Sequence, residues 1–232
     1  MTREISPGEY CHEDLGDAFE RAASAYDTAR RVEVLVDAFL DDAMVVDRET
    51  LDVGCGFGAF SQRLMQRGAR LTACDLGPKL VEKTVARVGC AGQVADVLEL
   101  TATFGRERFD LIVSSECIEH TPAPARAVAQ MAEVLRPGGY LSLSTPNLLW
   151  SPVVKLATKL RLRPFDGYEE FSTWWGLERT LRQAGLEVVR KQGLHLFPFQ
   201  LPLHGLSRWC DRRLQRARWL MINLCLLARK PS

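Results

Sequence analysis

From about residue 49, short apolar runs alternate with segments whose apolar residues recur every three to four positions. The run FDLIVSS at 109–115 is apolar almost throughout, as is typical of a parallel strand buried on both faces. Helical spacing, with Pro78 and Gly89 at the ends of one segment, favours helices between the runs. Repeated strand–helix units predict a mostly parallel sheet covered on both faces. The predicted strands are 49–54, 69–75, 91–96, 109–115, 140–146, 186–197 and 221–230, and the predicted helices are 58–68, 77–89, 124–139 and 174–185.

The chain is expected to form one domain. Its 232 residues suit a single α/β unit, and 47% hydrophobic with 25% charged residues is ordinary for a globular protein. Two helices are expected over 15–46, where apolar positions such as Val32, Leu35 and Phe39 recur at helical spacing. Long inserts in a compact domain often cover a ligand. The expected organisation over 1–232 is N-terminal helices at 1–46, a cofactor-binding core at 47–147 and lid inserts at 148–170 and 194–220.

Charge and cysteine content narrow the classes of function. The formal net charge is +1, so no whole-chain field favours nucleic acid. The seven cysteines are odd in number and form no C-x-x-C pair, which indicates reduced thiols. The first residues lack the apolar core of a signal peptide, and no run reaches the roughly eighteen apolar residues of a membrane span. We therefore expect a cytoplasmic protein.

The motif LDVGCGFGAF at 51–60 places three glycines directly after the first predicted strand. Gly54, Gly56 and Gly58 fit G-x-G-x-G, and Ala59 also completes the dinucleotide pattern G-x-G-x-x-A. Glycine permits a tight turn and close approach of the backbone to a ligand, which the following helix faces with its N-terminus. The glycines therefore predict a nucleotide site and leave the nucleotide open.

Three acidic residues narrow that choice. Asp75 ends the second strand, nineteen residues after Gly56, where a carboxylate can accept both ribose hydroxyls. Asp96 ends the third strand, where it could meet the edge of an adenine. Asp52 lies two residues before Gly54, where its charge would oppose a pyrophosphate and favour an ammonium or sulfonium centre. S-adenosylmethionine has both centres and no phosphate, although Asp52 could instead accept hydrogen bonds from its own turn.

In these motifs the sequence resembles the class I S-adenosylmethionine-dependent methyltransferases. The resemblance rests on LDVGCGFG, ACDLG, FDLIVSSECIEHTPAPARAVAQMAEVLRPGGYLSLSTPN and the closing NLCLLARK, and it is densest over about 48–146. Within that superfamily the chain is most similar to the ubiquinone-biosynthesis O-methyltransferases. That similarity continues through GYEEFSTWWGLERTLRQAGLEVVRKQGLHLFP, with a Gly-Leu-His turn that ends at His195.

The resemblance implies a Rossmann-like seven-stranded sheet of order 3-2-1-4-5-7-6, with the last strand antiparallel and helices on both faces. It implies that the glycine loop holds the methionyl part of the cofactor, that Asp75 holds the ribose and that Ser115 lines the site. Arg31 is the nearest match to an N-terminal arginine that contacts the cofactor in the ubiquinone enzymes, although its spacing to the loop differs by a few residues. The residues expected to bind the cofactor are Arg31, Asp52, Gly54, Cys55, Gly56, Gly58, Asp75, Leu76, Asp96, Val97 and Ser115.

Catalytic chemistry is expected after the fourth strand, in SSECIEH. Glu116, Glu119 and His120 are spaced i, i+3, i+4, so one helical turn would bring them to one face. Histidine titrates near neutrality, so His120, helped by Glu116, could accept a phenol proton. Alternatively, these three residues bind Mg²⁺ or Zn²⁺, and the cation lowers the pKa of substrate oxygens. Their E-x-x-E-H pattern resembles the metal triad of ubiquinone O-methyltransferases and of small-RNA 2′-O-methyltransferases. In a third interpretation, Glu119 and His120 only brace the loop.

The two inserts combine basic and apolar residues. Three interpretations are open. An amphipathic basic helix suits an anionic membrane surface, and arginine and tryptophan can also stack on RNA bases. A simple lid would instead cover the sheet with its apolar face and keep its arginines in water. We expect a small-molecule acceptor as partner, leave contact with the inner face of the membrane open, and consider nucleic acid disfavoured. The residues concerned are Leu149, Val153, Leu156 and Leu160 in the first insert, and Arg208, Trp209, Arg212, Arg213, Arg216, Arg218 and Trp219 in the second.

These features predict a monomeric or loosely dimeric methyltransferase that modifies oxygen on a small apolar phenol, catechol or quinol. A specialised-metabolite methyltransferase acting on a sugar, lipid or polyketide is the alternative. An NAD-dependent oxidoreductase, which Asp52 opposes, and a non-catalytic chain that keeps the fold are more remote. The sequence leaves the acceptor unnamed, and O-methylation is not separated from C- or N-methylation. His195 and His204 are expected to be packed or solvent-facing, and Trp174 and Trp175 to fill core or line a pocket.

Overall fold

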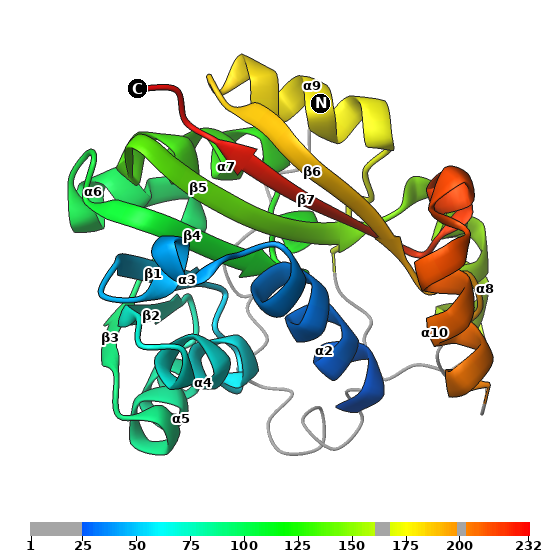
Figure 1. The fold of residues 1–232 in the computed structure, drawn as a ribbon, viewed down its shortest axis with the longest axis horizontal. Helices are drawn as coiled ribbons and strands as arrows, with labels where there is room; N and C mark the ends of the chain where they lie inside the picture. Colours follow the sequence, from blue (N-terminus) through cyan, green and yellow to red (C-terminus); the bar gives the residue numbers. More distant parts are fainter. Residues whose placement is uncertain (1–24, 161–167, 199–202) are drawn as a thin grey trace.

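A seven-stranded sheet forms the centre of the molecule, in a computed structural model that describes residues 25–160, 168–198 and 203–232. The strand order is β3-β2-β1-β4-β5-β7-β6 (Figure 1). Only β7 runs antiparallel to its neighbours, so the predicted sheet is confirmed. The strands are β1 (Glu49–Val53), β2 (Arg70–Asp75), β3 (Ala91–Val94), β4 (Phe109–Ser115), β5 (Leu135–Pro146), β6 (Glu187–Leu194) and β7 (Asn223–Arg229).

Helices cover both faces of this sheet. One face carries α2, α4 and α5, and the other carries α6, α7 and α9 (Figure 1). The helix α2 continues as a π-helical segment, η3. The helices are α2 (Ala25–Val32), η3 (Glu33–Ala38), α3 (Asp42–Val45), α4 (Ala59–Gln66), α5 (Pro78–Val88), α6 (Leu100–Phe104), α7 (Pro124–Val134), α8 (Ser151–Lys159), α9 (Trp174–Gln183) and α10 (His204–Arg213), with short 3-10 segments η4 (Val97–Glu99), η5 (Ile118–His120), η6 (Leu148–Trp150) and η7 (Gln215–Leu220).

Alternation along the strands divides the core into two hydrophobic clusters, one on each face. In β4, Ile112 packs with residues of α7 and α9, whereas Leu111 and Val113 pack with residues of η3 and α4. All three are fully buried. Because successive side chains of a strand point to opposite faces, a continuous apolar run fills both clusters at once.

The end of α7 differs from the prediction. The sequence predicts a helix in the segment 124–139 that Pro137 stops, whereas α7 ends at Val134, and Leu135 already pairs with Phe109 of β4. The next pair in register is Leu111 with Tyr140, so residues 136–139 form a bulge within β5. Leu135 and Phe109 are both buried, and their packing ends the helix before the proline is reached.

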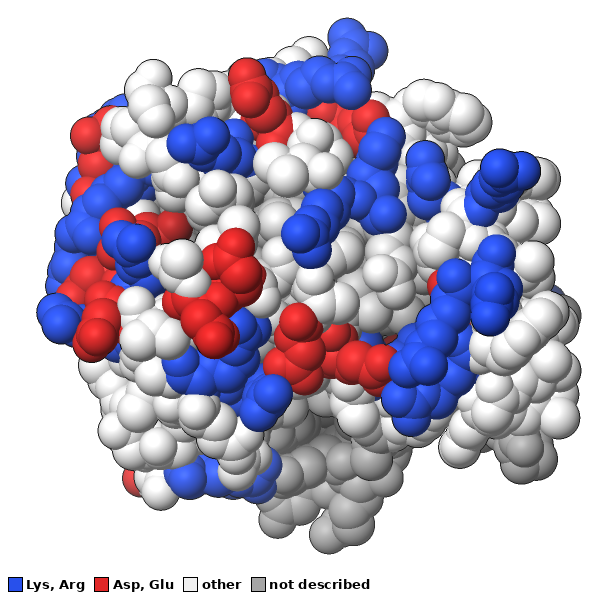
Figure 2. Space-filling model, viewed as in Figure 1, with Lys and Arg blue, Asp and Glu red and all other residues white. Residues whose placement is uncertain are grey.

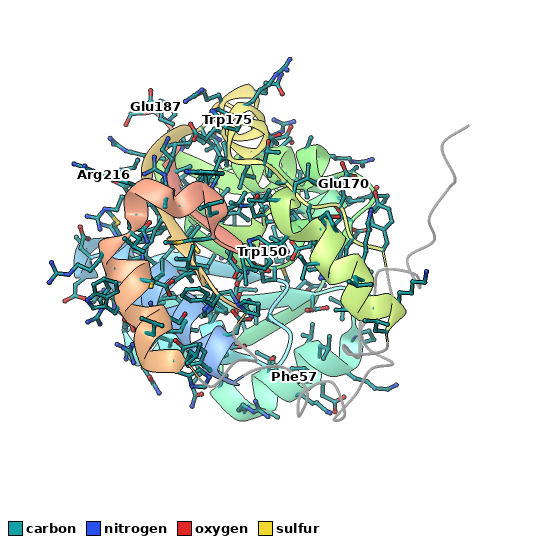
Figure 3. All side chains as sticks on the ribbon, turned by 90° about the vertical axis from the view of Figure 1, so that its right-hand side faces the viewer. Phe57, Trp150, Glu170, Trp175, Glu187 and Arg216 are labelled. Carbon is teal, nitrogen blue, oxygen red and sulfur yellow. The ribbon has the colours of Figure 1, made fainter. Side chains whose placement is uncertain are left out.

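Helices α8 and α10, one from each insert, lie on the side of the molecule that faces the viewer in Figure 3. The indole Nε1 of Trp150, at the start of α8, donates to the carbonyl of Leu220 in η7 at 2.8 Å. The side-chain amide of Asn147 donates to the carbonyl of Trp219 at 2.9 Å. Residues 15–24 of the predicted N-terminal helices lie outside the described residues. Within the described part of the chain, no helix is long and apolar enough to cross a membrane.

Candidate active site

A cavity of about 270 Å³ opens at the carboxyl ends of β1, β2 and β4. Strand order reverses between β1 and β4, and open α/β sheets bind ligands at such a point. Most of the predicted cofactor-binding residues line this cavity. The lining residues are Thr28, Arg31, Val53, Gly54, Cys55, Gly56, Phe57, Ala59, Phe60, Cys74, Asp75, Leu76, Leu80, Ala95, Asp96, Val97, Ser115, Glu116, Cys117, His120 and Thr121.

The glycine loop lines the cavity through Gly54, Cys55 and Gly56. Gly54 has φ of +73°, and a Cβ there would lie 2.8 Å from the Sγ of Cys117. Glycine is therefore needed at this position both for the left-handed backbone and for the close approach of the loop after β4. At Gly56, with φ of +49°, a Cβ would meet nothing within 4 Å, so only the conformation favours glycine. Gly58 is the N-cap of α4 and does not line the cavity.

Two carboxylates stand at the rim in defined orientations. Asp75 accepts hydrogen bonds from the backbone N–H of Gly56 at Oδ2 and of Gly77 at Oδ1, each at 3.0 Å. Asp96 accepts from the N–H of Leu98 at 2.8 Å. A carboxylate offers about four acceptor positions, so backbone bonds of this kind orient it without saturating it. The geometry around Asp75 fits a ribose with two hydroxyls.

Asp52 does not line the cavity, so the expectation that its charge faces the ligand is wrong. It is 2% exposed, and it accepts a hydrogen bond from the hydroxyl of Ser61 in α4 at 2.5 Å. Burial, which outweighs the bond from Ser61, raises the pKa of Asp52 to about 7. Strand alternation explains the placement: Leu51 and Val53 pack on one face of the sheet, and Asp52 points to the opposite face beneath α4.

The helix α2 brings a cation to the cavity. Arg31 donates from Nη1 to the hydroxyl of Ser115 at 2.7 Å and from Nη2 to Oδ2 of Asp27 at 2.9 Å. Its neighbouring carboxylates hold its pKa above the ordinary value despite burial. Arg31 is thus a fixed positive charge in the cavity wall, which fits the carboxylate of a methionyl group.

Glu116, Glu119 and His120 do not form the expected helical face. Glu116 has φ of +52°, and the 3-10 turn η5 begins only at Ile118. Both oxygens of Glu116 accept hydrogen bonds, from Ser144 at 2.8 Å and Asn223 at 3.0 Å, while Oε2 of Glu119 accepts from Thr145 at 3.1 Å. Burial raises the pKa of both carboxyls, and that of Glu119 is raised further by Glu116.

This arrangement does not fit a divalent cation. Glu119 is 1% exposed and does not line the cavity, whereas Glu116 and His120 do. Across the described ranges, no group of three or more His, Cys, Asp or Glu side chains is placed to hold a metal ion. The predicted metal triad is therefore not supported by the geometry of the described residues.

His120 is oriented by the last residues of the first insert. Its Nδ1 lies 3.2 Å from the carbonyl oxygen of Tyr168, and a carbonyl can only accept. Nδ1 therefore carries the hydrogen, and Nε2 is the basic nitrogen of the neutral ring. Nε2 lies 3.9 Å from Oε1 of Glu119.

Several lining residues were not predicted. Thr28, Phe57, Cys117 and Thr121 each lie within a few residues of a predicted position, which is the signal that could have found them. Burial raises the pKa of the Cys117 thiol, so it lines the cavity as a neutral group. Trp174 lies in the core, Trp175 is 80% exposed, and neither lines the cavity.

The other two histidines among the described residues differ from one another. His195 is fully buried, and its Nε2 lies 3.0 Å from Oδ1 of Asp27. His204 is exposed and stacks on the ring of Tyr26, with ring centroids 3.9 Å apart. Neither histidine lines the cavity.

The sheet order, the left-handed glycine loop and the carboxylate that ends β2 together define a class I S-adenosylmethionine-dependent methyltransferase. Residues 51–143 match the family model described as a methyltransferase domain. A ubiquinone biosynthesis O-methyltransferase of Hahella chejuensis is 30% identical over 199 residues, which cover 80% of this chain and 83% of that protein. That of Nitrosococcus oceani is 32% identical over 168 residues, covering 67% and 70%. The chain belongs to the family of the ubiquinone biosynthesis O-methyltransferases.

Solved structures agree in fold. An S-adenosylmethionine-dependent methyltransferase from Mesorhizobium loti superposes with a TM-score of 0.67 at 20% identity, covering 88% of this chain and all of that one. A possible histamine N-methyltransferase from Thermotoga maritima gives a TM-score of 0.68 at 16% identity, covering 94% and 98%. At these identities the likeness establishes the fold alone.

Proposed function

We propose that this methyltransferase modifies an oxygen of a small, apolar phenolic acceptor, a catechol or a quinol. The observation that carries the proposal is the position of His120, a basic side chain that lines the same cavity as the glycine loop and Asp75. The relatives named as ubiquinone biosynthesis O-methyltransferases support a phenolic acceptor.

The cofactor would lie along the cavity. The loop from Gly54 to Gly56 and the cation of Arg31 would hold its methionyl part, Asp75 its ribose, and Asp96 with Val97 its adenine. When bound, S-adenosylmethionine supplies a methyl group on a sulfonium: the acceptor oxygen bonds to that carbon while the carbon–sulfur bond breaks and its electron pair leaves on S-adenosylhomocysteine. The protein mainly aligns the two reactants.

His120 would take the proton of the phenol. Its Nδ1–H is directed to the Tyr168 carbonyl, which leaves Nε2 as the base. Glu116, held by Ser144 and Asn223, borders the same space. General-base catalysis contributes about 10²–10⁴-fold, so His120→Ala should lower kcat by that range and leave S-adenosylhomocysteine affinity nearly unchanged.

An acceptor screen with labelled cofactor tests the proposal. Catechols, demethylated quinols, sugars, lipids and polyketides are offered, and mass spectrometry of the product separates O- from C- or N-methylation. Turnover of a phenol that falls in His120→Ala supports the assignment. Transfer confined to a sugar or polyketide, or to carbon or nitrogen, would replace it with the specialised-metabolite alternative. Parallel reactions with EDTA report whether a divalent cation takes part.

The inserts suggest that the acceptor arrives from a membrane surface. Figure 3 shows α10 and α8 on opposite sides of the view, with Trp150 between them and Phe57 below. Figure 2 shows basic side chains over α10. Apolar side chains of both inserts are about half exposed, and both inserts also carry bases, as do helices that lie on anionic lipid. The apolar residues are Leu149, Val153, Leu156 and Leu160 on the first insert, and Leu206, Trp209 and Trp219 on the second.

Sedimentation with vesicles tests this contact. We expect binding to vesicles of phosphatidylcholine with phosphatidylglycerol, and weaker binding to phosphatidylcholine alone. Trp209→Ala should reduce it, while Trp175→Ala, a matched exposed tryptophan on α9, should not. Equal sedimentation of both variants, or none of the wild type, would leave the inserts as a lid without lipid contact.

A further inference from the structure

We propose that Asp27 and His195 are positioning residues that hold Arg31 in the cavity wall, so that they set the affinity for the carboxylate end of the cofactor. The inference rests on the cofactor-binding role proposed above for Arg31. Neither Asp27 nor His195 lines the cavity. Their action would pass through a chain of three hydrogen-bonded side chains.

The first link fixes the guanidinium. Arg31 donates to Oδ2 of Asp27 from both Nε, at 3.2 Å, and Nη2, at 2.9 Å. This two-point contact defines the plane of the guanidinium group. The remaining nitrogen, Nη1, is then directed to the hydroxyl of Ser115 at 2.7 Å, inside the cavity. A long arginine side chain without this contact would sample several rotamers.

The second link fixes the carboxylate. Asp27 is 8% exposed, and its Oδ1 lies 3.0 Å from Nε2 of His195. Arg31 and His195 hold the pKa of Asp27 below its ordinary value despite burial, so this side chain is an ionised acceptor. Nε2 of His195 therefore donates, and the two oxygens of Asp27 serve different partners, one from α2 itself and one from beyond β6.

The third link fixes the histidine. His195 is fully buried directly after β6, with a left-handed φ of +60° that a non-glycine residue rarely adopts. Its N–H donates to Oδ1 of Asp211 in α10 at 3.0 Å, and its carbonyl accepts from the N–H of Ile222 at 3.0 Å. The strained backbone is thus held by two other segments, and strain of this kind concentrates at functional sites.

The orientation of Arg31 therefore depends on residues far apart in the sequence. His195 lies 168 residues from Asp27, and Asp211, which holds its backbone, also accepts from Nη2 of Arg30 at 3.3 Å. The second insert is in this way connected to the cation of the cofactor site. A purely structural pair would stabilise α2, but it would not distinguish one part of the ligand from another.

Two ligands separate these roles. S-adenosylhomocysteine has the amino-acid carboxylate, and 5′-methylthioadenosine has the same adenosine and thioether without it. Dissociation constants for both are measured by calorimetry on the full chain, together with the melting temperature of each variant. The wild type should bind S-adenosylhomocysteine more tightly than methylthioadenosine.

His195→Leu removes the donor, and Asp27→Asn must turn an NH₂ group toward one of two donors. Each change should weaken the binding of S-adenosylhomocysteine about tenfold and the binding of methylthioadenosine less than about twofold. His195→Gln keeps an N–H donor and should recover most of the loss. His204→Leu, which removes an exposed histidine beside the same helix, should leave both affinities unchanged.

The outcomes are distinct. A selective loss of affinity for S-adenosylhomocysteine, recovered in His195→Gln, supports the inference. A parallel loss of both ligands, or unchanged affinity in Asp27→Asn, would overturn it, and Asp27→Asn with His195→Gln carry the comparison if His195→Leu does not fold. A wild type that binds both ligands equally refutes the contact of Arg31 and this inference but leaves the cofactor site intact. A wild type that binds neither refutes the proposed function as well.

Discussion

Replacement of Asp75 by asparagine tests the assignment of the ribose site with the smallest change in shape. Both oxygens of Asp75 accept from backbone N–H groups, those of Gly56 and Gly77. Whichever way an asparagine turns, its NH₂ faces one of these donors. A donor left without an acceptor costs about 1–3 kcal/mol, and a lost charge-assisted bond to a ribose hydroxyl costs about 1.5–3 kcal/mol. We therefore expect S-adenosylhomocysteine affinity to fall roughly 10- to 100-fold.

Asp110 offers a matched control. It is also half-buried, and it accepts from the N–H of Glu49 at 3.0 Å and from Nη1 of Arg136 at 2.9 Å, away from the cavity. Both variants should lower the melting temperature by about 2–4 °C per kcal/mol lost. Calorimetric titration should show weaker binding only in Asp75→Asn. Equal affinity in Asp75→Asn and the wild type would refute the ribose assignment.

Two further expectations concern stability. The pKa of Asp52 is about 7 in the folded chain, against an ordinary 3.8. Between these values the folded state keeps a proton that the unfolded state has released. The free energy of unfolding therefore falls as pH rises from about 4 to 7. Asp52→Asn should therefore gain stability over the wild type from pH 5 to 8, by up to about 4 kcal/mol in urea denaturation; a pH-independent difference would contradict this. Gly54→Ala should lower the free energy of unfolding by more than Gly89→Ala does. At Gly89 the loss is only the left-handed strain of about 1–2 kcal/mol, whereas at Gly54 the new Cβ also overlaps Cys117. Equal losses would show that the overlap relaxes freely.

Elements with strong local patterns were predictable. The strand 109–115 agrees with β4 at both ends, because an apolar run between two polar segments has few other ways to be buried. The glycine loop was predictable because its residues must adopt positive φ, which restricts them to glycine. Asp75 lines the cavity as expected, since the end of a parallel strand fixes on which edge of the sheet its last residue lies.

Predictions failed where a short pattern was assumed to be regular. The spacing of Glu116, Glu119 and His120 places them on one face only if a helix runs through all of them, and the left-handed backbone at Glu116 prevents this. Asp52 was placed by its distance along the chain from Gly54, whereas strand alternation decides which side it faces.

Contacts between distant segments could not be predicted. Nothing near His195 in the sequence indicates that its partner is Asp27, because only the folded sheet brings the end of β6 to α2. The same holds for Asn223, which donates to Glu116 from a strand 107 residues later. Periodicity describes one element at a time and contains no information about such pairs.

The position of β7 has a consequence for the order in which the molecule can be completed during synthesis. This strand lies between β5 and β6, so β6 has no sheet neighbour until residues 223–229 have left the ribosome. Its first residue also supplies one of the two donors that hold Glu116. A nascent chain that has already made its glycine loop and β4 therefore still lacks one donor to Glu116. The seventh strand supplies both that donor and the sheet neighbour of β6, so one segment completes the sheet and the surroundings of this carboxyl group.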